Sequence, residues 1–134
     1  MSETFEAGRL RHVHPGPLRI ECGPSLVVVR AVETYPRGTV VTWTCSPSGS
    51  EIARLAQGTP HLTVRLADHA GTEYAPLGES VQGGGRTLFG ASFFGAAPPP
   101  GTDELIIEGE VTGALGGGLA MHGRGTFSLA SADG

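Results

Sequence analysis

Two histidines near the start of the chain have the spacing of a metal clamp. His12 and His14 are separated by one residue, so on an extended strand both imidazoles point to the same side. Imidazole pairs of this kind occur in zinc and other transition-metal sites, and a third ligand could come from His61, His69 or His122. The alternative is an exposed strand on which the histidines are merely polar. We predict no bound metal, with His12 and His14 as the candidates if one does bind.

Asp68 is the second candidate ligand. Together with Glu73 it could contribute to a calcium loop, but the twelve-residue pattern of such loops is absent. The order Asp68-His69-Ala70-Gly71 fits a turn better, because aspartate caps turns with its own side chain and glycine supplies a positive φ. We therefore expect a turn at this point.

The chain carries no pattern that predicts an enzyme. Ser92 lies in Gly90-Ala91-Ser92-Phe93-Phe94, where the closing glycine of a nucleophile elbow comes one residue late and the context is a strand end. Because all nine basic residues are arginine, the lysine of P-loops and Schiff-base enzymes is missing. Glu104, Glu108 and Glu110 fit a solvated strand face. We predict no catalytic residues and no cofactor.

Two cysteines, Cys22 and Cys45, stand at the ends of expected strands. The N-terminus lacks the basic and apolar regions of a secretory signal, and the longest strongly apolar stretch, 26–29, is far too short to span a membrane. These features favour a cytoplasmic protein. A disulfide is conceivable, but the cytoplasm disfavours it, and two buried free thiols are expected instead.

Composition restricts the partners. A net charge of −4 provides no basic excess for phosphate contacts, so neither nucleic acid nor a membrane is an expected partner. With 39% hydrophobic and 16% charged residues, the 134-residue chain can bury a core despite its 22 glycines and 10 prolines. We expect one domain over 1–134, with a flexible N-terminus at 1–8 and a tail at 130–134.

The elements that must position these residues are mostly strands, because apolar residues recur every second position and glycine or proline marks the breaks. A single short helix is expected near 50–57, where serine and glutamate have capping-box spacing. The segment 78–86 is expected to be a flexible loop, and 95–101 an extended proline-stiffened connector. The eight expected strands are 18–22, 25–34, 39–46, 61–68, 72–77, 87–94, 104–112 and 119–129.

Eight strands separated by frequent turns predict an antiparallel β-sandwich or barrel. The most distinct hairpin joins 25–34 to 39–46 through Tyr35-Pro36-Arg37-Gly38. The strand 61–68 is expected to pair with 72–77. The first hairpin strand is apolar on both faces, so one face needs a cover, either a second sheet, the short helix or a partner subunit. Its two faces would be Val27, Val29 and Ala31 against Leu26, Val28 and Val32.

The stretch 62–107 carries a resemblance. Asp68-x-x-Gly71 is followed by Tyr74, a polyglycine loop, a strand ending at Phe93-Phe94, and Pro98-Pro99-Pro100-Gly101-Thr102 before an apolar strand. This order resembles the immunoglobulin-like β-sandwich modules of uncharacterised actinobacterial proteins, and the lysine-free composition is similar to that of high-GC bacterial proteins. The resemblance implies a fold and no activity. The Cys, Trp and Cys spacing of antibody domains is not matched, so their inter-sheet disulfide is not carried over.

Three functions are consistent with the sequence. The first is a non-catalytic sandwich that serves as a structural or protein-interaction module, possible partners including copies of itself. The second is a small-molecule or carbohydrate binding module that stacks ligand on Trp43, Tyr35 or Tyr74. The third is a cupin-like metal barrel that uses the histidines. We expect the first. Alternation along the strands does not specify the strand order, the choice between sandwich and barrel, or the oligomeric state.

Overall fold

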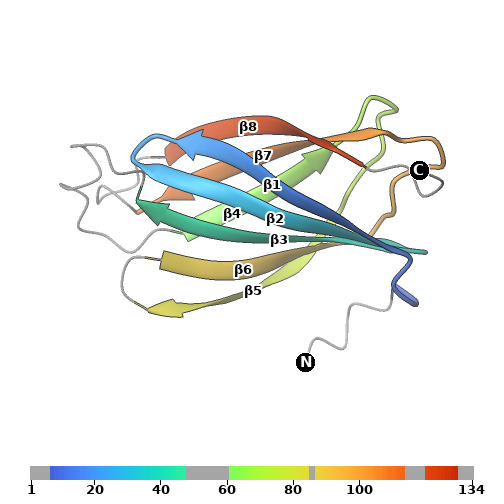
Figure 1. The fold of residues 1–134 in the computed structure, drawn as a ribbon, viewed down its shortest axis with the longest axis horizontal. Helices are drawn as coiled ribbons and strands as arrows, with labels where there is room; N and C mark the ends of the chain where they lie inside the picture. Colours follow the sequence, from blue (N-terminus) through green and yellow to red (C-terminus); the bar gives the residue numbers. More distant parts are fainter. Residues whose placement is uncertain (1–6, 48–60, 85–86, 114–119, 130–134) are drawn as a thin grey trace.

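The computed structural model describes residues 7–47, 61–84, 87–113 and 120–129, and within them the chain folds as two packed antiparallel sheets (Figure 1). The expected helix near 50–57 and the tail at 130–134 lie outside the described residues. No helix in the described part of the chain is long and apolar enough to cross a membrane. The strands are β1 (His12–Cys22), β2 (Ser25–Tyr35), β3 (Gly38–Pro47), β4 (His61–Ala67), β5 (Pro76–Gly84), β6 (Thr87–Phe94), β7 (Glu104–Thr112) and β8 (Ala120–Ser128).

Strand order identifies the kind of sandwich. The larger sheet has the order β1-β2-β3-β6-β5 and the smaller one β4-β7-β8. If β1 is set aside, β2 to β8 occupy the positions of strands A to G in a constant-type immunoglobulin domain, whose sheets are ABED and CFG. The predicted immunoglobulin-like sandwich is therefore confirmed. The strand β1 is an addition that pairs with β2 at the edge of the larger sheet.

The core lies between the two sheets, where alternate residues of each strand face inward. Val41, Trp43 and Cys45 on β3 are almost completely buried, as their shared parity predicts. From the smaller sheet, Leu105 and Ile107 on β7 meet them in one continuous cluster. Since Trp43 is only 1% exposed, it fills the core and is not a surface platform.

The predicted faces of β2 change along the strand. The register between β2 and β3 shifts between Val29 and Ala31, so a bulge at Arg30 reverses the alternation that follows it. Val27 and Val29 face the core as expected, but Val32 joins them with no exposed surface, while Ala31 turns outward. The prediction that grouped Val32 with the opposite face is wrong, because simple alternation cannot show a bulge.

The first strand is longer than the sequence predicted. β1 begins at His12 and passes through Pro15 and Pro17, whereas the sequence predicts a strand only from residue 18. Its register against β2 shifts between Pro15 and Leu18. Prolines are tolerated there because β1 is an edge strand and has an irregularity at this point.

Three expectations about the middle of the chain are wrong. β4 pairs with β7, not with the segment that follows it, and the supposed flexible loop at 78–86 contributes most of β5, which pairs with β6. A strand at the edge of a sheet is held by hydrogen bonds between backbone groups, which glycine also has. A glycine-rich segment that suggests a loop can therefore form an edge strand. The connector at 95–101 is also not fully extended, because Thr102 N–H donates to the Pro99 carbonyl at 3.1 Å and Gly101 has φ +88°.

The two long sides of the sandwich differ. On one side β8 crosses close to β1 (Figure 1), and a Cβ at Gly123 would collide with the Glu21 carbonyl, so only glycine permits this approach. On the other side the edge strands β4 and β5 are linked by His61 and Glu79, whose Nε2 and Oε1 atoms are 3.8 Å apart. Ala7, expected in the flexible N-terminus, is buried and its carbonyl accepts a hydrogen bond from Arg37 N–H.

Candidate functional site

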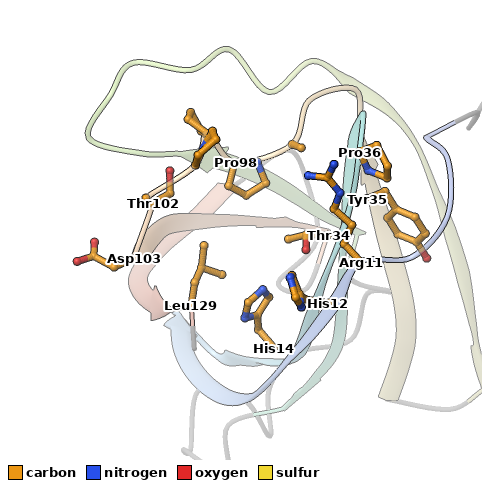
Figure 2. Close-up of a pocket in the computed structure, with 14 residues that line it drawn as sticks. Arg11, His12, His14, Thr34, Tyr35, Pro36, Pro98, Thr102, Asp103 and Leu129 are labelled. Atoms are coloured by element: carbon orange, nitrogen blue, oxygen red, sulfur yellow. The ribbon is translucent and has the colours of Figure 1, made fainter. Parts of the chain in front are cut away.

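A cleft of about 670 Å³ opens at the end of the sandwich that contains the β2–β3 turn (Figure 2). Four segments that are distant in sequence form its walls: the start of β1, the end and turn of β2, the connection between β6 and β7, and Leu129 after β8. The connection between β6 and β7 also separates this cleft from a smaller hollow of about 210 Å³ beside Asp68 and His69. The lining residues with polar side chains are Arg11, His12, His14, Thr34, Tyr35, Thr102 and Asp103.

His12 and His14 lie side by side in this cleft. Both come from β1 and pair with Thr34 and Val32 of β2, two residues with side chains buried on the inner face. Their ring centroids are 5.9 Å apart and their planes are inclined at 56°. Figure 2 shows the two imidazoles together between Leu129 and Thr34, below Pro98. The strand thus presents both rings to the same side, as the spacing predicts.

The two imidazoles differ in exposure. His12 is exposed, whereas His14 is 7% exposed. Burial lowers the pKa of His14 below its ordinary value, and the charge of the neighbouring His12 adds to this effect. At neutral pH the His14 ring is therefore uncharged, with one nitrogen able to accept a proton or a metal ion.

Tyr35 lies at the rim of the cleft, and its hydroxyl group is engaged by a neighbouring side chain. Its hydroxyl donates to Glu33 Oε1 at 3.0 Å. Burial, this hydrogen bond and the Glu33 charge together raise the pKa of Tyr35. Tyr74, the other tyrosine considered for stacking, is 6% exposed and donates to Asp68 Oδ2 at 2.7 Å. Of the three aromatic residues proposed as a stacking platform, only Tyr35 reaches the cleft.

Asp68 is a turn residue, as expected. Its Oδ1 accepts hydrogen bonds from Ala70 N–H at 2.9 Å and Thr72 N–H at 3.0 Å, and Gly71 has φ +80°. Since Tyr74 occupies the second carboxylate oxygen, both oxygens are engaged within the turn. Glu73 is exposed and shares none of these contacts.

The serine and the two cysteines considered as possible nucleophiles are buried in the core. Ser92 is buried, and its Oγ accepts a hydrogen bond from Trp43 Nε1–H at 3.0 Å. Cys22 and Cys45 are buried and free. Burial raises the pKa of each thiol to about 11, which makes them poor nucleophiles.

Two of the other histidines lie close to glutamates of β7 at the surface of the molecule. His69 Nε2 lies 3.0 Å from Glu104 Oε1, and His122 Nε2 lies 3.5 Å from Glu110 Oε2. None of His61, His69 and His122 lines the cleft, so none of them is placed as a third ligand beside His12 and His14. Within the described ranges no three His, Cys, Asp or Glu side chains are grouped to hold a metal ion.

Sequence reasoning missed most of the cleft. Arg11, Thr34, Thr102 and Asp103 gave no signal, because each belongs to a different segment and only the fold brings them together. The sequence pointed to two parts of the lining, the spaced pair His12 and His14 and the proline run at 98–100, which it predicted as a connector. The proline run forms a wall of the cleft instead of a simple connector.

Comparison with known proteins supports the fold alone. No family model matches the chain, and no curated protein matches it either. A crystal structure described as the conserved domain protein from Bacillus anthracis is similar, with a TM-score of 0.72 and 12% sequence identity. The similarity covers 89% of this chain and 50% of that one, so this chain spans half the length of that protein.

Proposed function

We propose that this chain is a non-catalytic β-sandwich module that acts through protein association, and that its partner is a second copy of itself. The observation that supports this proposal is the set of apolar side chains on the outer face of the larger sheet. This outer face is defined by Val13, Leu26, Val28, Ala31, Phe89 and Ala91. Val13 and Phe89 are each 52% exposed, and the other four are half-buried. Val28 and Phe89 stand on either side of Thr44 in the register, and Ala31 and Ala91 stand on either side of Thr42. The apolar side chains of β2 and β6 are therefore separated only by a row of threonines on β3. Apolar side chains gathered on one exposed face are a feature of interaction sites.

The opposite face of the molecule has a different character. On the smaller sheet, Glu108 stands between Arg65 and Arg124 in the register, and Glu110 stands between Thr63 and His122. This alternation of charges is suited to water. Because the two faces are built on the same sandwich, their contrast favours a role for the apolar one in association.

The charges around the outer face fit a two-fold symmetric partner. Arg19 and Glu21 on β1, with Arg30 and Glu33 on β2, provide two positive and two negative side chains. An isologous interface places the same surface on both sides, so each arginine can face a glutamate of the other copy. Five strands about 4.8 Å apart and roughly eight residues long have a footprint of about 600 Å². This is comparable to the roughly 800 Å² that each partner contributes to a stable interface.

Sedimentation velocity over a range of concentrations tests this proposal. The tag-free chain should sediment as a dimer, and Phe89→Arg should shift it to monomer because a charge would be buried in the interface. Thr126→Arg is the matched control, since Thr126 is an exposed strand residue on the charged face. A wild-type chain that stays monomeric at high concentration would overturn self-association. Equal effects of both substitutions would overturn the assignment to this face.

The binding-module alternative keeps only Tyr35 of its three stacking residues, since Trp43 and Tyr74 are buried. The cupin-like alternative relies on a further histidine beside His12 and His14, and none of His61, His69 and His122 lines the cleft in which those two lie. The cleft at the end of the sandwich is nevertheless a specific observation in favour of a small ligand.

A further inference from the structure

The cleft contains a buried polar group without a partner. His14 is 7% exposed, yet its ring makes no hydrogen bond to another described residue. Its aromatic neighbour is the ring of His12. Every fully buried side-chain nitrogen or oxygen in the described part of the chain does have a hydrogen-bond partner. The His14 nitrogens are therefore reached from the cleft, where solvent or a ligand must satisfy them.

The second imidazole is placed to share that ligand. His12 enters the same cleft from the same strand, and 5.9 Å separates the ring centroids. With metal–nitrogen bonds of about 2.1 Å, two imidazoles on one ion have ring centres roughly 4.5–5.2 Å apart at coordination angles of about 90–109°. The observed separation is somewhat longer, so the exposed His12 side chain has to rotate toward His14 for both rings to reach one ion.

We propose that His12 and His14 form a two-histidine site for a first-row divalent metal ion of the type that prefers imidazole, with Cu²⁺ bound most tightly and Ni²⁺ and Zn²⁺ less so. Imidazole ligands select these ions over Ca²⁺ and Mg²⁺, which require oxygen ligands. The remaining coordination positions face the cleft of about 670 Å³, which leaves space for water or a small ligand on the ion.

The charges around the site do not oppose a cation. Besides the histidines, the ionised side chains that line the cleft are Arg11 and Asp103, one of each sign. Asp103 is exposed and its carboxylate points away from the imidazoles in Figure 2. The protein thus supplies two ligands to the ion. This number agrees with the absence of a cluster of three metal-binding side chains in the described ranges.

Titration calorimetry with CuCl₂, NiCl₂ and ZnCl₂ tests the site on tag-free protein, and electron paramagnetic resonance of the Cu²⁺ form identifies the ligands. We expect one ion per chain, with nitrogen hyperfine structure from two imidazoles. Loss of an outer-shell partner weakens metal sites by about 10–100-fold, so His12→Ala should weaken binding by at least about tenfold. Because His12 is exposed, this variant should keep the fold, which circular dichroism checks.

The chain offers its own controls. His122→Ala removes an exposed strand histidine on the charged face and His69→Ala removes an exposed turn histidine, and both variants should bind as the wild type does. His14→Gln should reduce binding as His12→Ala does. Cu²⁺ binding that survives in the His12→Ala, His14→Gln double variant, or that is equally weakened by His122→Ala, would overturn the proposal. So would the absence of stoichiometric binding to the wild type. Since the oligomeric state is measured separately, this result is independent of the proposed self-association.

Discussion

At the level of single residues, Asp68 is held by hydrogen bonds from its own turn and from Tyr74. Burial alone would raise the pKa of Asp68, but the hydrogen bonds from Thr72, Tyr74 and Ala70 outweigh it and hold the pKa at about 2. The carboxylate is therefore stabilised in the folded state relative to the unfolded chain, where its pKa is near 3.8. The resulting stability is present above about pH 4 and is lost as the pH falls toward 2.

Asp68→Asn tests this contribution. Hydrogen bonds to a charged group contribute about 1.5–3 kcal/mol each, so the variant should lose about 2 kcal/mol of unfolding free energy at neutral pH. The loss should shrink toward pH 2, because the wild-type carboxylate is then protonated as well. Urea denaturation at several pH values measures both effects. A loss that stays constant with pH would show that the side-chain charge does not matter.

The two cysteines give a chemical test at the same scale. Burial raises the pKa of Cys22 to about 11, and for Cys45 the neighbouring Cys22 thiol adds to burial while a hydrogen bond with Ser25 opposes it. At pH 8 both thiols are protonated and inaccessible, so iodoacetamide should leave the folded protein unmodified. Mass spectrometry should find two alkylated thiols only after denaturation. Rapid alkylation of the native protein would contradict the buried placement.

At the level of elements, the close approach of β1 and β8 depends on a missing side chain. A methyl group at Gly123 would collide with the Glu21 backbone carbonyl and would also press on Ile20. We expect Gly123→Ala to cost about 1–3 kcal/mol, the usual range for overpacking. Thr126→Ala on the solvent side of β8 is the control and should cost little. Equal melting temperatures for the two variants would show that β1 can move away without penalty.

The elements also show what local sequence determines. β6 and β7 have the bounds that alternation predicts, and the hairpin at Tyr35–Gly38 forms as its turn residues indicate. By contrast, β5 is specified by its pairing with β6, and the bulge at Arg30 by the fit between β2 and β3. The cleft also combines local and long-range features. The spacing of His12 and His14 is visible in the local sequence, whereas the other lining residues come from distant segments that only the fold brings together.

At the scale of the whole molecule, the two sheets share one core. Side chains of β2, β3 and β6 on the larger sheet contact those of β4, β7 and β8 on the smaller one in a single cluster. Neither sheet can retain its buried face alone, because separation would expose apolar side chains such as Val41 and Leu105. The added strand β1 joins this core through Ile20 and Cys22, so it is part of the same cooperative unit.

Trp43 reports on that unit directly. As the chain's single tryptophan, 1% exposed and hydrogen-bonded to Ser92, it should emit at short wavelength and resist quenching by acrylamide in the native state. When urea separates the sheets, its emission should shift to the red at the same denaturant concentration at which circular dichroism loses the β signal, because one core predicts one transition. A fluorescence transition that precedes the loss of β structure would show that the sheets part before they unfold. The core would then not be the single cooperative unit that its contacts indicate.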